Sequence, residues 1–190
     1  MSLPKAKVMV FVDGPRVWLR ITGHANFTVA PDFKRLLHQL HAKGYRRFVV
    51  DLSQCVLLDS TFLGLLCGLG VKLHQSGDPD AGVDLLNPSP RIVQLLENLG
   101  VCQLLRIVQA PNAEPAPAPA TESPLGQTPI DRAELARTSL EAHNTLMQLN
   151  PANEARFKDV TQFLAEDLQR LENAKAETPA SPTPDPSSCT

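Results

Sequence analysis

Between residues 8 and 108, short apolar runs alternate with segments of helical periodicity. The first two runs flank Asp13-Gly14-Pro15, a turn sequence that predicts an antiparallel hairpin. The third, Phe-Val-Val-Asp-Leu, is compact and typical of a strand buried on both faces. The predicted strands lie at residues 8–12, 17–21, 48–52, 83–86 and 104–108.

Three helices are predicted between these strands. Apolar residues recur at helical spacing after Pro31, and Gly44 stands where that helix should stop. A second helix begins near Asp59, and a third opens at Ser89-Pro90. The order ββαβαβαβ predicts an α/β fold in which functional residues lie at the far ends of the strands.

The rest of the chain differs in composition. We expect a first domain over residues 1–109 and a proline- and alanine-rich linker over 110–127, which cannot bury enough apolar surface to order itself. Residues 128–173 predict two helices broken at Asn150-Pro151, and residues 174–190 are compositionally disordered. The apolar stripe of the last helix consists of Phe157, Val160, Leu164, Leu168 and Leu171.

The second helix carries more apolar surface than one sheet can cover. Leu63, Cys67 and Val71 lie on a different side from the stripe that starts at Phe62 and runs to Leu73. A helix with one face on a sheet should have a polar outer face. The excess predicts that the C-terminal helices, a partner or a second copy cover it.

Charge and hydropathy exclude several classes of protein. Lys plus Arg (18) nearly balance Asp plus Glu (20), so no strong field attracts nucleic acid or an anionic membrane. No segment approaches the length of a transmembrane helix, and the N-terminus does not resemble a signal peptide, so we expect a cytoplasmic protein. The four cysteines are widely spaced; Cys55, Cys67 and Cys102 sit in apolar runs and are expected to be buried thiols.

The motifs of catalysis and cofactor binding are missing from the sequence. It has neither GxSxG nor the glycine-rich nucleotide loops, so no enzyme activity and no cofactor are expected. His38 and His41 are three residues apart on a predicted helix, but no carboxylate or cysteine completes a metal site, so solvent-facing histidines are expected.

The segment FVVDLSQCVLLDSTFLGLL, residues 48–66, resembles the signature of STAS domains of the anti-sigma factor antagonist family. In that family an apolar strand ending in Asp-Leu-Ser is followed by Asp-Ser-Ser-Gly-Leu-Gly. Residues 19–23, Leu-Arg-Ile-Thr-Gly, are similar to the family's strand-end motif. The resemblance covers residues 8–108 and implies a STAS-like mixed β-sheet flanked by helices, to which a C-terminal helical hairpin is added.

This resemblance implies a phosphorylation switch. The unmodified family domain binds a kinase-type anti-sigma factor, and phosphorylation of a serine at the start of the second helix ends that binding. Ser60 matches this serine, Asp59 the preceding aspartate, and Thr61 the following position, which makes Thr61 a second candidate acceptor. The residues expected to bind the partner are Asn26, Asp59, Ser60, Thr61, Phe62 and Leu63.

The sequence departs from the family at two positions. Phe62 replaces a glycine and packs into the core or alters the partner-facing surface; Asn26 replaces a common aspartate and removes a negative charge. Two other functions are therefore kept open: an assembly subunit that forms homo-oligomers through its C-terminal helices, and a nucleotide-sensing module.

Overall fold

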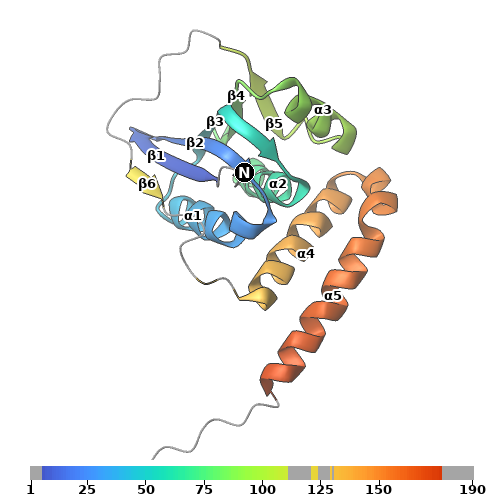
Figure 1. Cartoon of the computed structure of the whole chain (residues 1–190). Coiled ribbons are helices and arrows are strands. Elements are labelled where there is room, and N and C mark those ends of the chain that lie inside the picture. The colour runs from blue at the N-terminus through green and yellow to red at the C-terminus, as the bar shows by residue number, and fades with distance from the viewer. Residues whose placement is uncertain (1–5, 111–120, 124–128, 130, 177–190) are drawn as a thin grey trace, which may run out of the picture.

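The computed structural model describes residues 6–110, 121–123, 129 and 131–176 (Figure 1). Its strands are β1 (Lys7–Asp13), β2 (Arg16–Ala25), β3 (Arg47–Leu58), β4 (Gly82–Leu86), β5 (Leu105–Val108) and β6 (Thr121–Ser123). Its helices are α1 (Ala30–Ala42), α2 (Ser60–Gln75), α3 (Pro90–Leu99), α4 (Arg132–Leu149) and α5 (Glu154–Ala176). Two short 3-10 helices, η1 (Phe27–Val29) and η2 (Pro151–Asn153), precede α1 and α5.

One sheet of order β5-β4-β3-β2-β1-β6 organises the fold. The β1–β2 pair is antiparallel, whereas β2, β3, β4 and β5 are parallel, which confirms the predicted ββαβαβαβ order and the mixed sheet. β6 falls inside the segment predicted as a linker and pairs antiparallel with β1, which the sequence did not predict. Most of that segment, and residues 177–190 of the predicted tail, lie outside the described residues.

The helices pack on one face of the sheet. Successive parallel strands step in one direction, and right-handed crossovers then place α1, α2 and α3 on the same side. A single core forms there between alternate strand residues and the apolar faces of the three helices, including Leu19, Val50, Phe33, Leu66 and Leu96, all of them buried.

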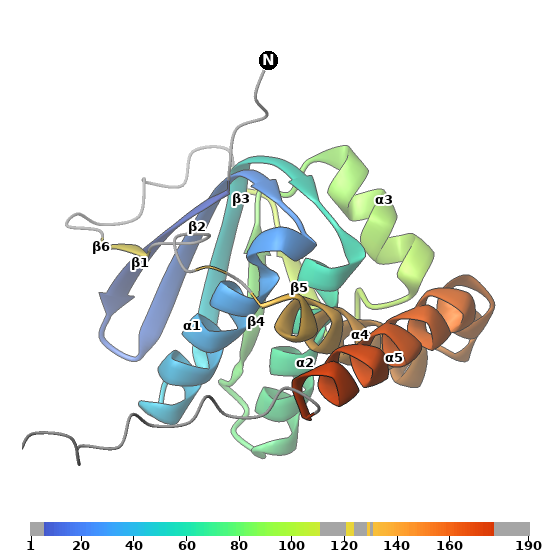
Figure 2. The ribbon, with the colours of Figure 1, turned by 60° about the horizontal axis from the view of Figure 1, so that its bottom comes forward.

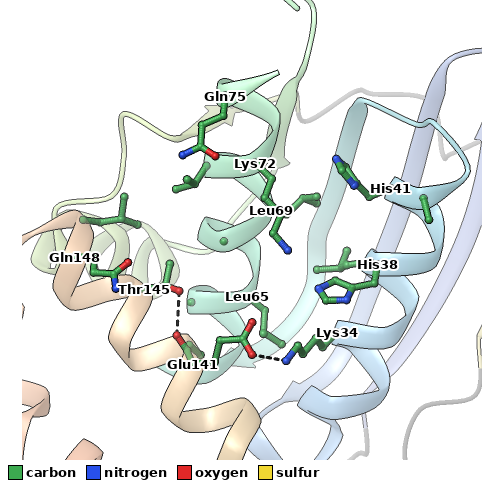
Figure 3. A pocket seen from close by; sticks show the side chains of 17 residues that line it. Lys34, His38, His41, Leu65, Leu69, Lys72, Gln75, Glu141, Thr145 and Gln148 are labelled. Atoms are coloured by element: carbon green, nitrogen blue, oxygen red, sulfur yellow. Dashed lines mark hydrogen bonds and ion pairs between the residues drawn. The ribbon is translucent and has the colours of Figure 1, made fainter. Parts of the chain in front are cut away.

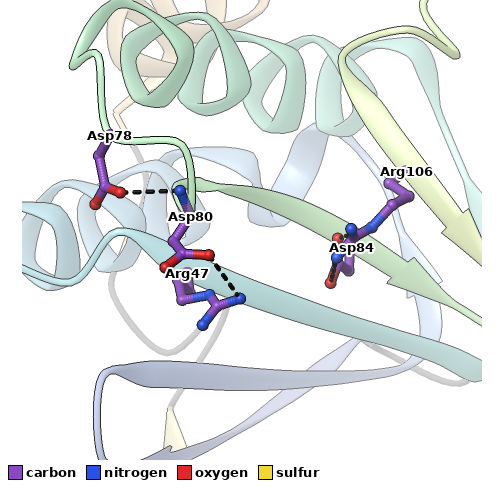
Figure 4. Close-up of polar contacts among 5 residues, drawn as sticks. All are labelled: Arg47, Asp78, Asp80, Asp84 and Arg106. Atoms are coloured by element: carbon purple, nitrogen blue, oxygen red, sulfur yellow. Dashed lines mark hydrogen bonds and ion pairs between the residues drawn. The ribbon is translucent and has the colours of Figure 1, made fainter.

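Charged pairs lie along the strands outside this core. Asp84 and Arg106 are cross-strand neighbours on β4 and β5 and form two hydrogen bonds of 2.8 and 2.7 Å (Figure 4). Arg47 at the start of β3 pairs with Asp80 at 3.4 Å, and the backbone of Asp80 donates to Asp78. The first pair joins β4 to β5, and the Arg47–Asp80 pair joins the α2–β4 connection to the sheet.

The cysteine predictions are confirmed in part. Cys55 and Cys67 are buried free thiols, and burial raises their pKa to about 11 and about 12. The prediction for Cys102 is wrong, because its side chain is exposed in the turn after α3. A turn at the edge of the core leaves one residue of an apolar run facing water.

The two C-terminal helices form the predicted hairpin and dock on the domain. α4 packs on α2 and α1, and α5 runs beside α4 on the side away from the sheet (Figures 1 and 2). Gly64 of α2 permits this approach, since a Cβ there would lie 2.5 Å from the carbonyl oxygen of Ala142. The excess apolar surface of α2 is therefore covered by the chain's own α4.

The turn between α4 and α5 is fastened to the end of α3. The side-chain amides of Asn150 and Asn153 donate to the carbonyl oxygen of Leu99 at 3.2 and 3.0 Å, and Asn153 also donates to Leu146. The side chain of Asn150 also packs against Gly100, where a Cβ would lie 2.4 Å from its amide nitrogen. The φ of 65° at Gly100 likewise favours glycine. The hairpin is thus held at both α2 and α3.

Candidate functional site

Asp59 fixes the start of α2 at the carboxyl end of the sheet. Its carboxylate accepts a hydrogen bond from the backbone N–H of Phe62 at 2.9 Å, which caps the helix, and another from Phe27 at 2.6 Å. One side chain therefore joins α2 to the turn that follows β2. Burial raises the pKa of Asp59, while the hydrogen bonds from Phe62 and Phe27 and the nearby His143 act in the opposite direction.

Ser60, the first residue of α2, contacts the C-terminal hairpin. Its Oγ lies 2.9 Å from Nε2 of His143 on α4. The other ring nitrogen, Nδ1, lies 2.8 Å from the carbonyl oxygen of Ser139, which can only accept a hydrogen bond. In the neutral ring Nδ1 therefore carries the proton, and the Ser60 hydroxyl donates to Nε2.

His143 sits in a mostly apolar setting. Its ring centroid lies 4.7 Å from that of Phe157 in the first turns of α5, and its side chain is buried. Burial lowers the pKa of His143, with smaller opposing effects from the Ser139 carbonyl and from Asp59. The ring is therefore neutral near pH 7, so that its Nε2 can accept a hydrogen bond from the Ser60 hydroxyl.

This pair differs from a hydrolase centre in two respects. His143 is oriented by a backbone carbonyl, where nucleophilic catalysis would use a carboxylate to stabilise an imidazolium. Asp59 occupies the N–H of Phe62, a donor that an oxyanion site at this helix terminus would use. In this structure the Ser60 hydroxyl is covered on one side by His143 of α4.

A cavity of about 470 Å³ opens beside Ser60. Asp59 and Ser60 form one side of it, and Arg91 of α3 and Arg156 of α5 contribute positive charge to its lining. Ser60 is half-buried, with His143 of α4 on one side, and the cavity beside it is lined in part by Arg156 and Phe157 of the same hairpin.

The predicted site residues divide into two layers. Asn26, Asp59 and Ser60 are half-buried at the end of the sheet, where the Asn26 side chain caps η1 by accepting from the N–H of Thr28 at 3.1 Å. Thr61, Phe62 and Leu63 point inward, and their exposed fractions are 3%, 0% and 0%. Phosphorylation of Thr61, and partner contacts by the inner three, stay predictions that would require this end of α2 to open.

Phe62 belongs to the core. Its ring stacks on Phe33 of α1, with centroids 4.1 Å apart and an interplanar angle of 18°. Of the two roles open to a bulky residue at the family's glycine position, the structure shows packing into the core.

Sequence reasoning missed three residues of this region. His143 lies 83 residues from Ser60, and nothing in its local sequence marks it. Phe27, at the start of η1, and Val56, near the end of β3, are 50% and 59% exposed. Exposed apolar side chains beside a covered polar group are suited to binding a protein.

The neutral state of His143 predicts a pH effect on stability. With its pKa lower in the fold than in the unfolded chain, the unfolded state takes up the proton first, so stability falls as pH drops below about 6.5. Urea unfolding at pH 7.5 and 5.5 should show this loss, and it should be smaller in His143→Gln. His38 and His41 shift in the same direction and remain in both proteins, so equal losses would contradict the prediction.

Two classes of feature are not found in the described part of the chain. It contains no group of three or more His, Cys, Asp or Glu side chains able to hold a metal ion. None of its helices is both long enough and apolar enough to cross a membrane.

Comparisons with known proteins agree with the signature at β3 and α2. A family model described as Mlab, STAS domain, matches residues 11–108. A STAS-domain containing protein of Pseudomonas aeruginosa (strain UCBPP-PA14) is 34% identical over 95 residues, covering 50% of this chain and 90% of that protein.

Similar solved structures include two proteins. The Thermotoga maritima protein TM1081 is 20% identical, with a TM-score of 0.47, over 53% of this chain and 79% of that one. The unphosphorylated anti-sigma factor antagonist SpoIIAA of Bacillus is 16% identical, with a TM-score of 0.47, over 59% of this chain and 92% of that one. From the family model and the Pseudomonas relative, this chain belongs to the STAS-domain family.

Proposed function

We propose that this protein is a protein-binding switch controlled by phosphorylation of Ser60, and that it binds a kinase-type anti-sigma factor or a related regulator in bacterial signalling. The observation that carries the proposal is the hydrogen bond from Ser60 to His143, because it couples the candidate acceptor to α4, a helix outside the residues that the family model matches. Family membership supports a regulatory protein-binding role.

The start of α2 suits a phosphate. The start of a helix carries partial positive charge, so a phosphorylated Ser60 need not unfold the domain, although Asp59 already accepts from the N–H of Phe62. Arg91 of α3 and Arg156 of α5 line the adjacent cavity and supply cations, and Arg91 would stay beside the phosphate if the hairpin moved. The phosphate also places about −1.5 to −2 charge units next to Asp59, a repulsion that alters the local surface.

Phosphorylation should release the hairpin. The hydroxyl proton that Ser60 donates to His143 is lost, and the new oxygens are acceptors that face another acceptor, the neutral Nε2. Moving α4 away would expose Leu63 and the outer side of α2 as a new apolar surface for the partner.

Ser60→Asp is expected to loosen α4 without unfolding the sheet. Loss of the buried hydrogen bond and the added charge should cost about 1–3 kcal/mol, which is about 5- to 150-fold faster exchange of α4 amides. Hydrogen exchange read by mass spectrometry measures this directly. Ser76→Asp at the other end of α2 is the control, and equal exchange in both variants would count against the coupling.

The identity of the switch residue is tested in the protein purified from its own cells. Site-resolved mass spectrometry should find phosphate on Ser60, and Ser60→Ala should remove that signal. Ser60→Ala and Ser60→Asp should then differ in binding the cognate partner. Equal binding by the two variants would contradict the proposed switch.

A second candidate function, an assembly subunit, is supported by α5. Its outward face exposes Val160 (37%) and Phe163 (60%), which are three residues apart on one side of the helix. Light scattering should then give a particle mass that is a multiple of 20.7 kDa, and Phe163→Ser should reduce it to 20.7 kDa. A wild-type particle of single-chain mass would contradict assembly and leave the switch unaffected.

A further inference from the structure

A groove of about 690 Å³ lies between α1, α2 and α4, away from Ser60 (Figure 3). Each of the three helices forms one wall, so the groove exists only while α4 is docked. Its size is that of a small-molecule site.

The floor of the groove is apolar. Leu37 of α1 and Leu65 and Leu69 of α2 line it, each less than a tenth exposed. Gly68 lies between them on α2, and a Cβ added there would meet nothing within 4 Å. Gly64, one turn earlier, is in tight contact with α4, so the two glycines have different roles: one admits the helix, and the other leaves the groove empty.

The rim of the groove is basic. Lys34, His38 and His41 on α1 face Lys72 on α2, and the one carboxylate in the lining, Glu141, pairs with Lys34 (Figure 3). Within the described ranges Lys72 makes no ion pair. Burial and the charges of Lys72 and Lys34 lower the pKa of His38.

We propose that this groove binds an amphipathic anion, with an unbranched apolar chain on the leucine floor and a carboxylate or phosphate head at Lys72 and His38. Apolar lining with a few polar groups at one end is how a site fixes both the affinity and the orientation of such a ligand. Lys72, which makes no ion pair among the described residues, favours an anion over a neutral or cationic amphiphile.

The ligand would also act on the hairpin. It binds only the arrangement in which α4 is docked, so by mass action it stabilises that arrangement.

Calorimetry with monomeric decanoate tests the site in the full-length chain, with decyl phosphate as the second head group and decyltrimethylammonium as the cationic control. Binding of either anion, but not of the cation, is expected. Lys72→Glu, an exposed change that leaves the fold intact, should weaken binding about tenfold.

Gly68→Leu supplies the decisive variant, because its side chain fills the groove from a position where added atoms meet nothing. It should abolish binding while the unfolding midpoint of the protein stays the same or rises. Undiminished binding by Gly68→Leu, binding of the cation as tight as that of decanoate, or no binding of either anion by the wild type would each overturn the proposal.

Discussion

Replacing Phe62 with alanine is expected to lower the free energy of unfolding by about 3–5 kcal/mol. The ring is fully buried and stacked on Phe33, so its removal leaves a cavity between α1 and α2 in addition to the lost transfer free energy. Urea denaturation of the full-length chain, followed by circular dichroism, measures the change. Phe62→Gly, which restores the residue usual in the family, should cost about 1 kcal/mol more because glycine disfavours a helix interior.

Phe27→Ala provides the matched control. This ring is half-exposed, so its removal should cost much less than the removal of Phe62. Equal stability of Phe62→Ala and Phe27→Ala would show that Phe62 is not in the core. It would then support the other role considered for Phe62, on a partner-facing surface.

A methyl group at Gly64 and one at Gly68 are expected to have opposite effects. Gly64→Ala places a Cβ 2.5 Å from the carbonyl oxygen and 2.8 Å from the carbonyl carbon of Ala142, so backbone must move and α4 should lose about 1–3 kcal/mol of docking free energy. Gly68→Ala meets no atom and should raise stability by about 0.5–1 kcal/mol through helix propensity.

Comparing Gly64→Ala with Gly68→Ala separates the effect on α4 docking from the effect on helix propensity, because both are Gly→Ala changes on α2. Urea unfolding gives the sign of each effect. Hydrogen exchange should localise the loss in Gly64→Ala to α4 and α5, with β2, β3 and β4 unchanged. Stabilisation by both substitutions would show that α4 does not lie against Gly64.

The sequence determined the elements of the domain, because these follow from patterns among near neighbours. The turn at Asp13-Gly14-Pro15 separates β1 from β2, and Asp59 was predicted as the start of α2 and is its cap. The break at Asn150-Pro151 likewise lies between α4 and α5. Each signal depends on a few consecutive residues, which act in the same way in any fold.

Strand limits were less well determined. β3 was predicted over residues 48–52 but continues to Leu58, since Leu57 and Leu58 pair with His24 and Ala25 of β2 across register shifts. β6 has only three residues, Thr-Glu-Ser, and pairs with β1 through its backbone. None of the three is apolar, so the sequence shows no strand pattern there. Pairing between strands, which local sequence does not encode, set both limits.

Ser60 was predicted as the phosphate acceptor from the residues next to it in the sequence, whereas only the tertiary structure shows that α4 packs over it. Ser60 stands in a local signature, but the contact with His143 spans 83 residues and exists because Gly64 admits α4 against α2. The sequence showed that α2 carried excess apolar surface and left open whether the chain itself, a partner or a second copy covered it. Packing complementarity between distant segments answered that question, because burial depends on which surfaces fit together in space and not on their order along the chain.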